Sequence, residues 1–106
     1  MKYQITLSDN QVDVLMRALE LFSRIHVGQF EEVVDGCIGP TLYKRNRWGD
    51  ITDIKDLLKK AKVIYTKMAE NASYGITQKE IAKEAKTSFD IYQQVRYVVS
   101  FQRNPE

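Results

Sequence analysis

The sequence predicts a mainly α-helical (α+β), compact single domain covering residues 1–106. Two long stretches with apolar residues at helical spacing begin after the capping-box sequences Ser8–Gln11 and Thr77–Glu80. Residues 2–7 instead alternate between apolar and polar side chains, which is typical of a half-buried strand. We therefore expect three to four helices, a short N-terminal β-strand and room for a small hairpin.

The strand would place Tyr3, Ile5 and Leu7 on one face. A single strand is not stable alone, so it must pair with another segment or with the same strand of a second subunit. The first helix follows Ser8 and ends near Gly28, because glycine readily adopts the left-handed conformation that terminates helices. Its apolar stripe consists of Val12, Leu15, Leu19 and Phe22.

The remaining elements follow in order. A short helix is expected over 29–35, ended by Gly36. Residues 36–50 contain three glycines and a proline, which favours a hairpin or a long loop. A helix over 52–70 is followed by a turn at 71–75 and by a last helix over 77–101, which Asn104-Pro105 ends. The apolar face of the 52–70 helix is Ile54, Leu57, Leu58, Ala61, Ile64 and Met68.

Composition excludes several classes of protein. The chain has one cysteine and one histidine, so it holds neither an internal disulfide nor a Cys/His zinc site within one copy. No apolar run is long enough to span a membrane, and the first residues do not form a secretory signal. We therefore expect an intracellular, cytoplasmic protein.

Catalysis has little support in the sequence. His26 and Cys37 stand without the neighbours that activate a nucleophile, and the acidic pair Glu31 and Asp35 fits a solvated helix face better than a metal site. We expect a protein that is not an enzyme and that has no metal and no cofactor.

Charge is unevenly distributed along the chain. The net charge is only +2. Residues 1–36 carry three basic and six acidic side chains, residues 37–69 carry eight basic and three acidic, and residues 70–106 balance. The basic middle third is either a solvated face or a surface that binds an anionic ligand or an acidic protein.

Residues 77–85 are similar to the first helix of a helix-turn-helix motif. However, the apolar periodicity continues through Lys86-Thr87-Ser88, where the turn should lie. This continuity favours one long helix, so nucleic acid is not the expected partner.

Three clusters mix aromatic rings with amides or guanidinium groups: residues 23–32, 71–75 and 90–97. Rings stack on a nucleobase, amides bond its edge and arginine pairs with its phosphate. The same residue types also serve ordinary helix packing and capping.

These clusters resemble a family of small, mostly uncharacterised bacteriophage proteins. The family pattern is SRI-x-x-GQFEE, NASYG and DIYQ-x-x-RY, running to RNPE. This chain carries SRIHVGQFEEV at 23–33, NASYGI at 71–76, FDIYQQVRY at 89–97 and RNPE at 103–106. It departs from the pattern in the Lys/Glu-rich stretch 77–88 and in stopping at Glu106, beyond which relatives continue.

By analogy with small phage anti-defence proteins, the resemblance implies a cyclic nucleotide sponge. Such a protein binds a cyclic di- or trinucleotide, or an ADP-ribose-type immune signal, and sequesters it without cleavage, as a homo-oligomer. The phosphate-binding candidates are Arg24, Arg96, Lys44, Arg45 and Arg47; the stacking candidates are Tyr74, Tyr92, Tyr97 and Trp48; the base-edge candidates are Gln29, Asn71 and Gln93.

Two other functions stay open. The charge difference between the first and middle thirds fits a phage inhibitor that binds a host protein. Residues 77–88 fit a small DNA-binding regulator of the helix-turn-helix kind. A homo-oligomer is expected in any case, because the lone strand needs a partner and the chain has many aromatic residues for a small core.

Overall fold

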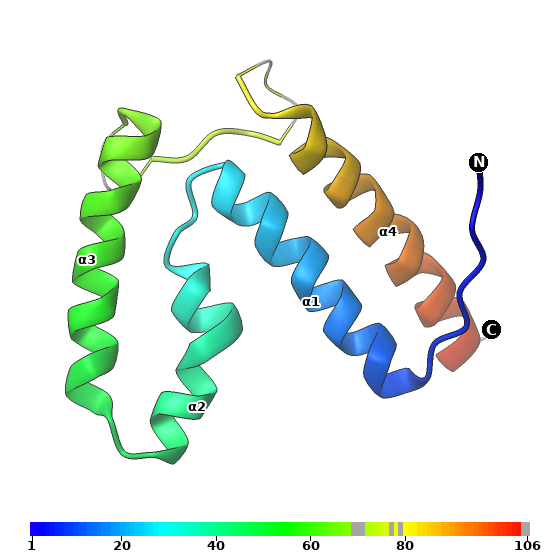
Figure 1. The fold of residues 1–106 in the computed structure, drawn as a ribbon, viewed down its shortest axis with the longest axis horizontal. Helices are drawn as coiled ribbons and strands as arrows, with labels where there is room; N and C mark the ends of the chain where they lie inside the picture. The colour runs from blue at the N-terminus through cyan, green and yellow to red at the C-terminus, as the bar shows by residue number, and fades with distance from the viewer. Residues whose placement is uncertain (69–71, 77, 79, 105–106) are drawn as a thin grey trace.

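The computed structural model describes residues 1–68, 72–76, 78 and 80–104, and this part is mainly helical. The elements are α1 (Asp9–His26), the π-helix η1 (Val34–Ile38), α2 (Gly39–Lys44), α3 (Trp48–Thr66) and α4 (Lys83–Arg103). Helix α4 runs antiparallel to α1, and α3 runs antiparallel to α2 (Figure 1). Helices α3 and α4 form the two outer edges of the molecule, with α1 and α2 between them (Figure 1).

The predicted N-terminal strand is wrong. Residues 1–8 lie outside any regular element, and the part of the chain that the structure describes contains no β-strand. Tyr3 and Ile5 are 81% and 79% exposed. Alternation alone does not make a strand, because a strand also needs a neighbouring edge to pair with.

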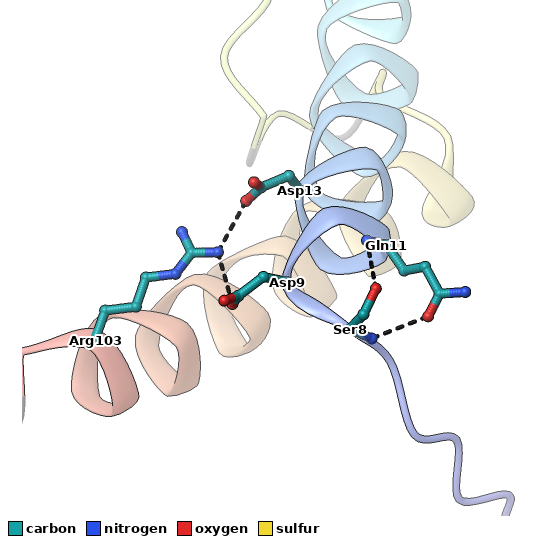
Figure 2. A network of polar contacts seen from close by, with 5 residues as sticks. All are labelled: Ser8, Asp9, Gln11, Asp13 and Arg103. Atoms are coloured by element: carbon teal, nitrogen blue, oxygen red, sulfur yellow. Dashed lines mark hydrogen bonds and ion pairs between the residues drawn. The ribbon is translucent and has the colours of Figure 1, made fainter.

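The predicted start of α1 is confirmed. Ser8 is the N-cap: its backbone N–H donates to Gln11 Oε1 at 2.9 Å, and the Gln11 N–H donates to Ser8 Oγ at 3.3 Å (Figure 2). Beside this cap, Arg103 at the end of α4 reaches the carboxylates of Asp9 and Asp13 at 3.1 and 3.2 Å (Figure 2). These ion pairs join the last turn of α4 to the first turns of α1.

Small side chains let α1 and α4 approach closely. Ala85 and Ser88 of α4 and Ser23 of α1 are buried. The Ser88 hydroxyl donates to the Leu19 carbonyl at 2.8 Å, and the Ser23 hydroxyl lies 3.0 Å from the same carbonyl. Each buried hydroxyl therefore has a hydrogen-bond partner at the interface.

The predicted stop at Gly28 is confirmed: α1 ends at His26, and Gly28 follows its C-cap Val27. The Gly28 N–H donates to the Ile25 carbonyl at 3.0 Å and the Gln29 N–H to the Arg24 carbonyl at 2.8 Å, which is the bond pattern of a Schellman motif. Gly28 has φ +94°, and a Cβ there would lie 2.9 Å from Cγ2 of Thr66. Glycine is thus required both by the backbone conformation and by the close approach of α3.

The predicted loop or hairpin over 36–50 is wrong, and so is the expected helix end at Gly36. The chain continues from η1 directly into α2. The Gly39 N–H donates to the Val34 carbonyl five residues earlier, and a Cβ on Gly39 would lie only 2.6 Å from that oxygen. Pro40 follows in the first turn of α2, where its missing N–H is tolerated. Glycine and proline here shape a wide helical turn instead of ending the helix.

Three predicted helix ends shift. Helix α3 begins at Trp48 rather than at 52 and ends at Thr66, after which Lys67 adopts a left-handed conformation. Helix α4 begins at Lys83, and the described residues between 78 and 82 are not helical. The second capping box is therefore wrong as a helix start; its Thr77 lies outside the described residues.

Two parts of the α4 prediction are confirmed. The helix stops at Asn104, its C-cap, as predicted, although its last residue, Arg103, lies two positions beyond the expected 101. It also runs without a break through Lys86–Ser88, so the turn of a helix-turn-helix motif is absent from this described segment.

The described core consists of two small clusters. One contains Val27, Ile81 and Ala85, where α1 meets α4. The other contains Val34, Leu42 and Ile51, where η1, α2 and α3 meet. None of the helices in the described part of the chain combines the length and the apolar character needed to cross a bilayer.

We expect Gly28→Ala to lower the free energy of unfolding by about 1–3 kcal/mol, because a side chain there strains the backbone and meets Thr66. Gly49→Ala is the matched control: a Cβ at Gly49 meets nothing within 4 Å, and alanine favours helix. Urea unfolding followed by circular dichroism measures both. Equal effects of the two substitutions would contradict the assigned role of Gly28.

Candidate functional site

A cavity of about 380 Å³ lies between α1, α4 and the segment 74–76. It brings together six residues that the sequence predicts for ligand binding, and they come from all three predicted clusters. The first cluster contributes Arg24 and Gln29, the second Tyr74, and the third Tyr92, Gln93 and Arg96. Residues more than 70 positions apart in the chain thus share one concave surface.

The other predicted site residues lie elsewhere. Lys44, Arg45, Arg47 and Trp48 lie at the turn between α2 and α3, which is at the opposite end of α3 from residues 72–76 (Figure 1). Tyr97 is on α4 but is 72% exposed and does not line the cavity. Asn71 lies outside the described residues.

Arg24 contacts three other side chains on the α1 side of the cavity. Its Nη1 donates to Gln29 Oε1 at 2.8 Å, across the Schellman turn. The same guanidinium lies 3.5 Å from the Glu20 carboxylate and 3.7 Å from that of Glu32. Two acidic groups therefore balance its charge, and the amide of Gln29 is fixed by it.

Tyr74 has a structural role as well as a place in the cavity. Its backbone N–H donates to the Val27 carbonyl at 2.8 Å, and its hydroxyl donates to the Thr66 carbonyl at 3.1 Å. The ring packs against the core cluster around Val27 and Ile81. With its hydroxyl engaged at the end of α3, Tyr74 offers the cavity an aromatic ring in a fixed position.

The α4 side presents one helix face. Tyr92 and Gln93 each lie three or four residues from Phe89 and from Arg96, so these four side chains are neighbours on the helix surface. The ring centroids of Phe89 and Tyr92 are 6.4 Å apart, within the range of aromatic contact. Arg96 is exposed and forms no ion pair with any residue in the described part of the chain.

Glu20 is a cavity residue that the sequence analysis missed. A hydrogen bond with Glu20, together with burial, raises the pKa of Tyr92 above its ordinary value. Glu20 also lies four residues before Arg24 on α1, the spacing at which helical side chains form ion pairs. That spacing is the signal that could have found it.

The arrangement suits binding of a planar, anionic molecule. It combines two guanidinium groups, three aromatic rings and two amides in a cavity whose volume lies in the usual range for small ligands, about 300–1,000 Å³. The two residues considered for nucleophilic chemistry lie outside it: Cys37 is exposed on η1, and His26 Nδ1 lies 3.4 Å from the Tyr65 hydroxyl.

A second basic and aromatic surface occurs at the turn between α2 and α3. Lys44 and Arg45 are exposed there, and Arg47 pairs with Asp50 at 2.7 Å. Trp48 packs edge-on against Tyr43, with centroids 4.5 Å apart. This turn is separate from the cavity and carries positive charge.

No family model, curated protein or solved structure matches the chain. The resemblance to small bacteriophage proteins therefore stays a prediction from the sequence motifs.

The pKa of Tyr92 can be measured by nuclear magnetic resonance with ¹³C-labelled tyrosine, the resonance being assigned with Tyr92→Phe. We expect the midpoint above the ordinary value of about 10, because the neutral phenol keeps its hydrogen bond to Glu20. The contribution of this hydrogen bond to the free energy of unfolding is complete below about pH 10 and is lost as the pH rises through the raised pKa of Tyr92. Glu20→Gln removes the carboxylate charge and should lower the midpoint. An unchanged midpoint in this variant would show that Glu20 does not act on Tyr92.

Proposed function

We propose that the protein binds a nucleotide-type ligand in the cavity between α1 and α4 and does not transform it. The observation that carries this proposal is the convergence of arginine, tyrosine and glutamine side chains from three separate sequence clusters on one cavity. Each cluster alone is explained by packing or capping, but packing does not require all three to face the same concave surface.

The roles of the residues follow from their contacts. Arg96 has no acidic partner in the described part of the chain and is the primary phosphate-binding group. Arg24 is neutralised by Glu20 and Glu32, so it serves by its position and by its remaining N–H donors. Tyr92 and Tyr74 supply ring surface for a base, and Gln93 supplies an amide for the base edge.

The size of the cavity limits the ligand. At about 380 Å³ it lies near the lower end of the range for small-molecule sites, which suits one nucleotide unit with its phosphate. A cyclic dinucleotide, a cyclic trinucleotide or an ADP-ribose-type signal would place one such unit in each chain. The biological role we propose is that of an anti-defence sponge of bacteriophage origin, acting in the host cytoplasm as a homo-oligomer.

A thermal-shift screen followed by calorimetry tests this function, with cyclic dinucleotides, cyclic trinucleotides and cyclic ADP-ribose isomers as ligands. At least one of them should raise the melting temperature. Arg96→Gln should weaken its binding about 10- to 100-fold, because a charge-assisted hydrogen bond is lost, while the unliganded melting temperature stays the same. Arg45→Gln, at the distant turn, should leave binding unchanged.

The fate of the ligand separates a sponge from an enzyme. The nucleotide released by denaturing the complex should have its original mass, whereas a cleaved product would indicate catalysis. No stabilisation by any ligand in the screen, with well-folded protein, would refute the proposed function.

The exposed basic turn favours a second candidate, an inhibitor that binds an acidic surface of a host protein. Lys44 and Arg45 project from the turn next to the Tyr43–Trp48 pair, a combination of charge and ring common in protein interfaces. Capture of one stoichiometric host protein, lost in the double variant Lys44→Ala with Arg45→Ala and insensitive to nucleotide, would support this candidate over the first.

A further inference from the structure

A second cavity, with a volume of about 390 Å³, lies between α3, residues 29–31 and residues 72–73. Among the lining residues that the structure describes, it shares only Gln29 with the cavity between α1 and α4. Its charged lining residues are three lysines and one carboxylate: Lys55, Lys59, Lys62 and Glu31. We call it the lysine cavity, because positive charge predominates in its wall.

The three lysines lie on one face of α3. They are four and three residues apart, so their side chains are neighbours on the helix surface. Like charges at this spacing repel each other and destabilise a helix. Asp35 balances the charge at one end of the row, where its carboxylate pairs with Lys55 at 2.9 Å. Lys59 forms no ion pair with any residue in the described part of the chain, so an anion in the cavity would supply the opposite charge there.

Lys62 differs from its neighbours because it is only 5% exposed. Lysine is rarely buried to this extent, since its ammonium group is strongly hydrated in water. The side chain extends toward the end of α1: a Cβ built on Gly28 would lie 3.7 Å from Lys62 Cε. A charge away from solvent is screened less, so Lys62 attracts a nearby anion more strongly than an exposed lysine does. The lining thus includes one buried cation and one exposed cation, Lys59.

Two neutral hydrogen-bond donors line the same cavity. Gln29 accepts a hydrogen bond from Arg24 through Oε1 at 2.8 Å, so its amide nitrogen keeps two N–H donors for other partners. Ser73 contributes a hydroxyl from a different part of the chain. Donors that come from three segments suit a phosphate, because its oxygens accept hydrogen bonds from several directions, whereas a carboxylate is planar.

We propose that the lysine cavity binds a phosphate group, held by the ammonium groups of Lys59 and Lys62 and by the neutral donors beside them. Phe30 and Leu58 add apolar surface to the same wall, which fits a phosphate carried by an organic molecule.

Two sources of this phosphate fit the geometry. One is a separate phosphorylated molecule. The other is a second phosphate of the nucleotide proposed for the cavity between α1 and α4, because the consecutive residues Ser73 and Tyr74 line one cavity each. Only the second source rests on the proposed function.

Titration of the full chain with inorganic pyrophosphate, followed by the backbone amide resonances of residues lining the lysine cavity, tests the proposal. The Ser73 resonance should shift and saturate at millimolar pyrophosphate in a buffer of low ionic strength, because salt screens the attraction. Lys59→Gln should raise the dissociation constant read from Ser73 about 10-fold, since a charge-assisted hydrogen bond is lost. Helicity measured by circular dichroism should not change.

Lys60→Gln is the matched control. Lys60 is also exposed on α3 and carries the same charge, but it does not line the lysine cavity, so the dissociation constant should stay nearly the same. Arg96→Gln, in the cavity between α1 and α4, should also leave it unchanged. Glu31→Gln removes the carboxylate from the described lining and should lower the dissociation constant, which a merely structural role of the lysines would not produce.

An unshifted Ser73 resonance at millimolar pyrophosphate would overturn the proposal. So would equal weakening by Lys59→Gln and Lys60→Gln, or weakening by Arg96→Gln in place of Lys59→Gln.

The nucleotide found in the thermal-shift screen separates the two sources of the phosphate. If its own phosphate occupies the lysine cavity, it competes with pyrophosphate and Lys59→Gln weakens its binding; if the source is a separate molecule, neither effect occurs. Both results require the phosphate site. Pyrophosphate binding without binding of any nucleotide would refute the proposed function and leave this inference intact.

Discussion

The junction at the end of α1 is the constraint on which the rest of the structure depends. Because Gly28 has no side chain, Cγ2 of Thr66 can come within the space that a Cβ would fill, and the end of α3 lies against the end of α1. Tyr74 then bonds both helices, through its N–H to Val27 and through its hydroxyl to Thr66. In the described part of the chain, α1 and α3 also meet where the Tyr65 hydroxyl lies 3.4 Å from His26 Nδ1, and both helices pack on η1.

The same junction builds one wall of the cavity. The Schellman turn places Gln29 within reach of Arg24, and Tyr74 is held where its ring lines the site. Residues that terminate helices thus also present guanidinium, amide and ring groups to the cavity. Because the same residues both end helices and line the cavity, these segments stand out in the sequence, although ordinary helix capping explains each of them alone.

Local signals in the sequence predicted local structure well. The cap at Ser8 and the stop at Gly28 act through neighbouring backbone groups, so α1 could be located from the sequence, and six of the predicted site residues do line one cavity. The predictions that were wrong depended on contacts with other parts of the fold, which local sequence patterns do not contain. Alternation over residues 2–7 lacked a partner strand, and Gly39 ended no helix because its N–H found the Val34 carbonyl. Periodicity also marked Leu57 and Ile64 as apolar positions but could not show that they are 64% and 68% exposed.

The π turn at Gly39 has a consequence for how the middle of the chain is oriented. In a regular α-helix, eight residues would rotate Leu42 roughly 80° away from Val34. The wider turn takes up an additional residue and resets this rotation, so both side chains enter the same cluster. The hydrogen bond between the Gly39 N–H and the Val34 carbonyl, which a side chain at Gly39 would obstruct, thereby sets the rotation of α2 about its axis. This rotation also sets the direction in which the basic residues at the end of α2 point.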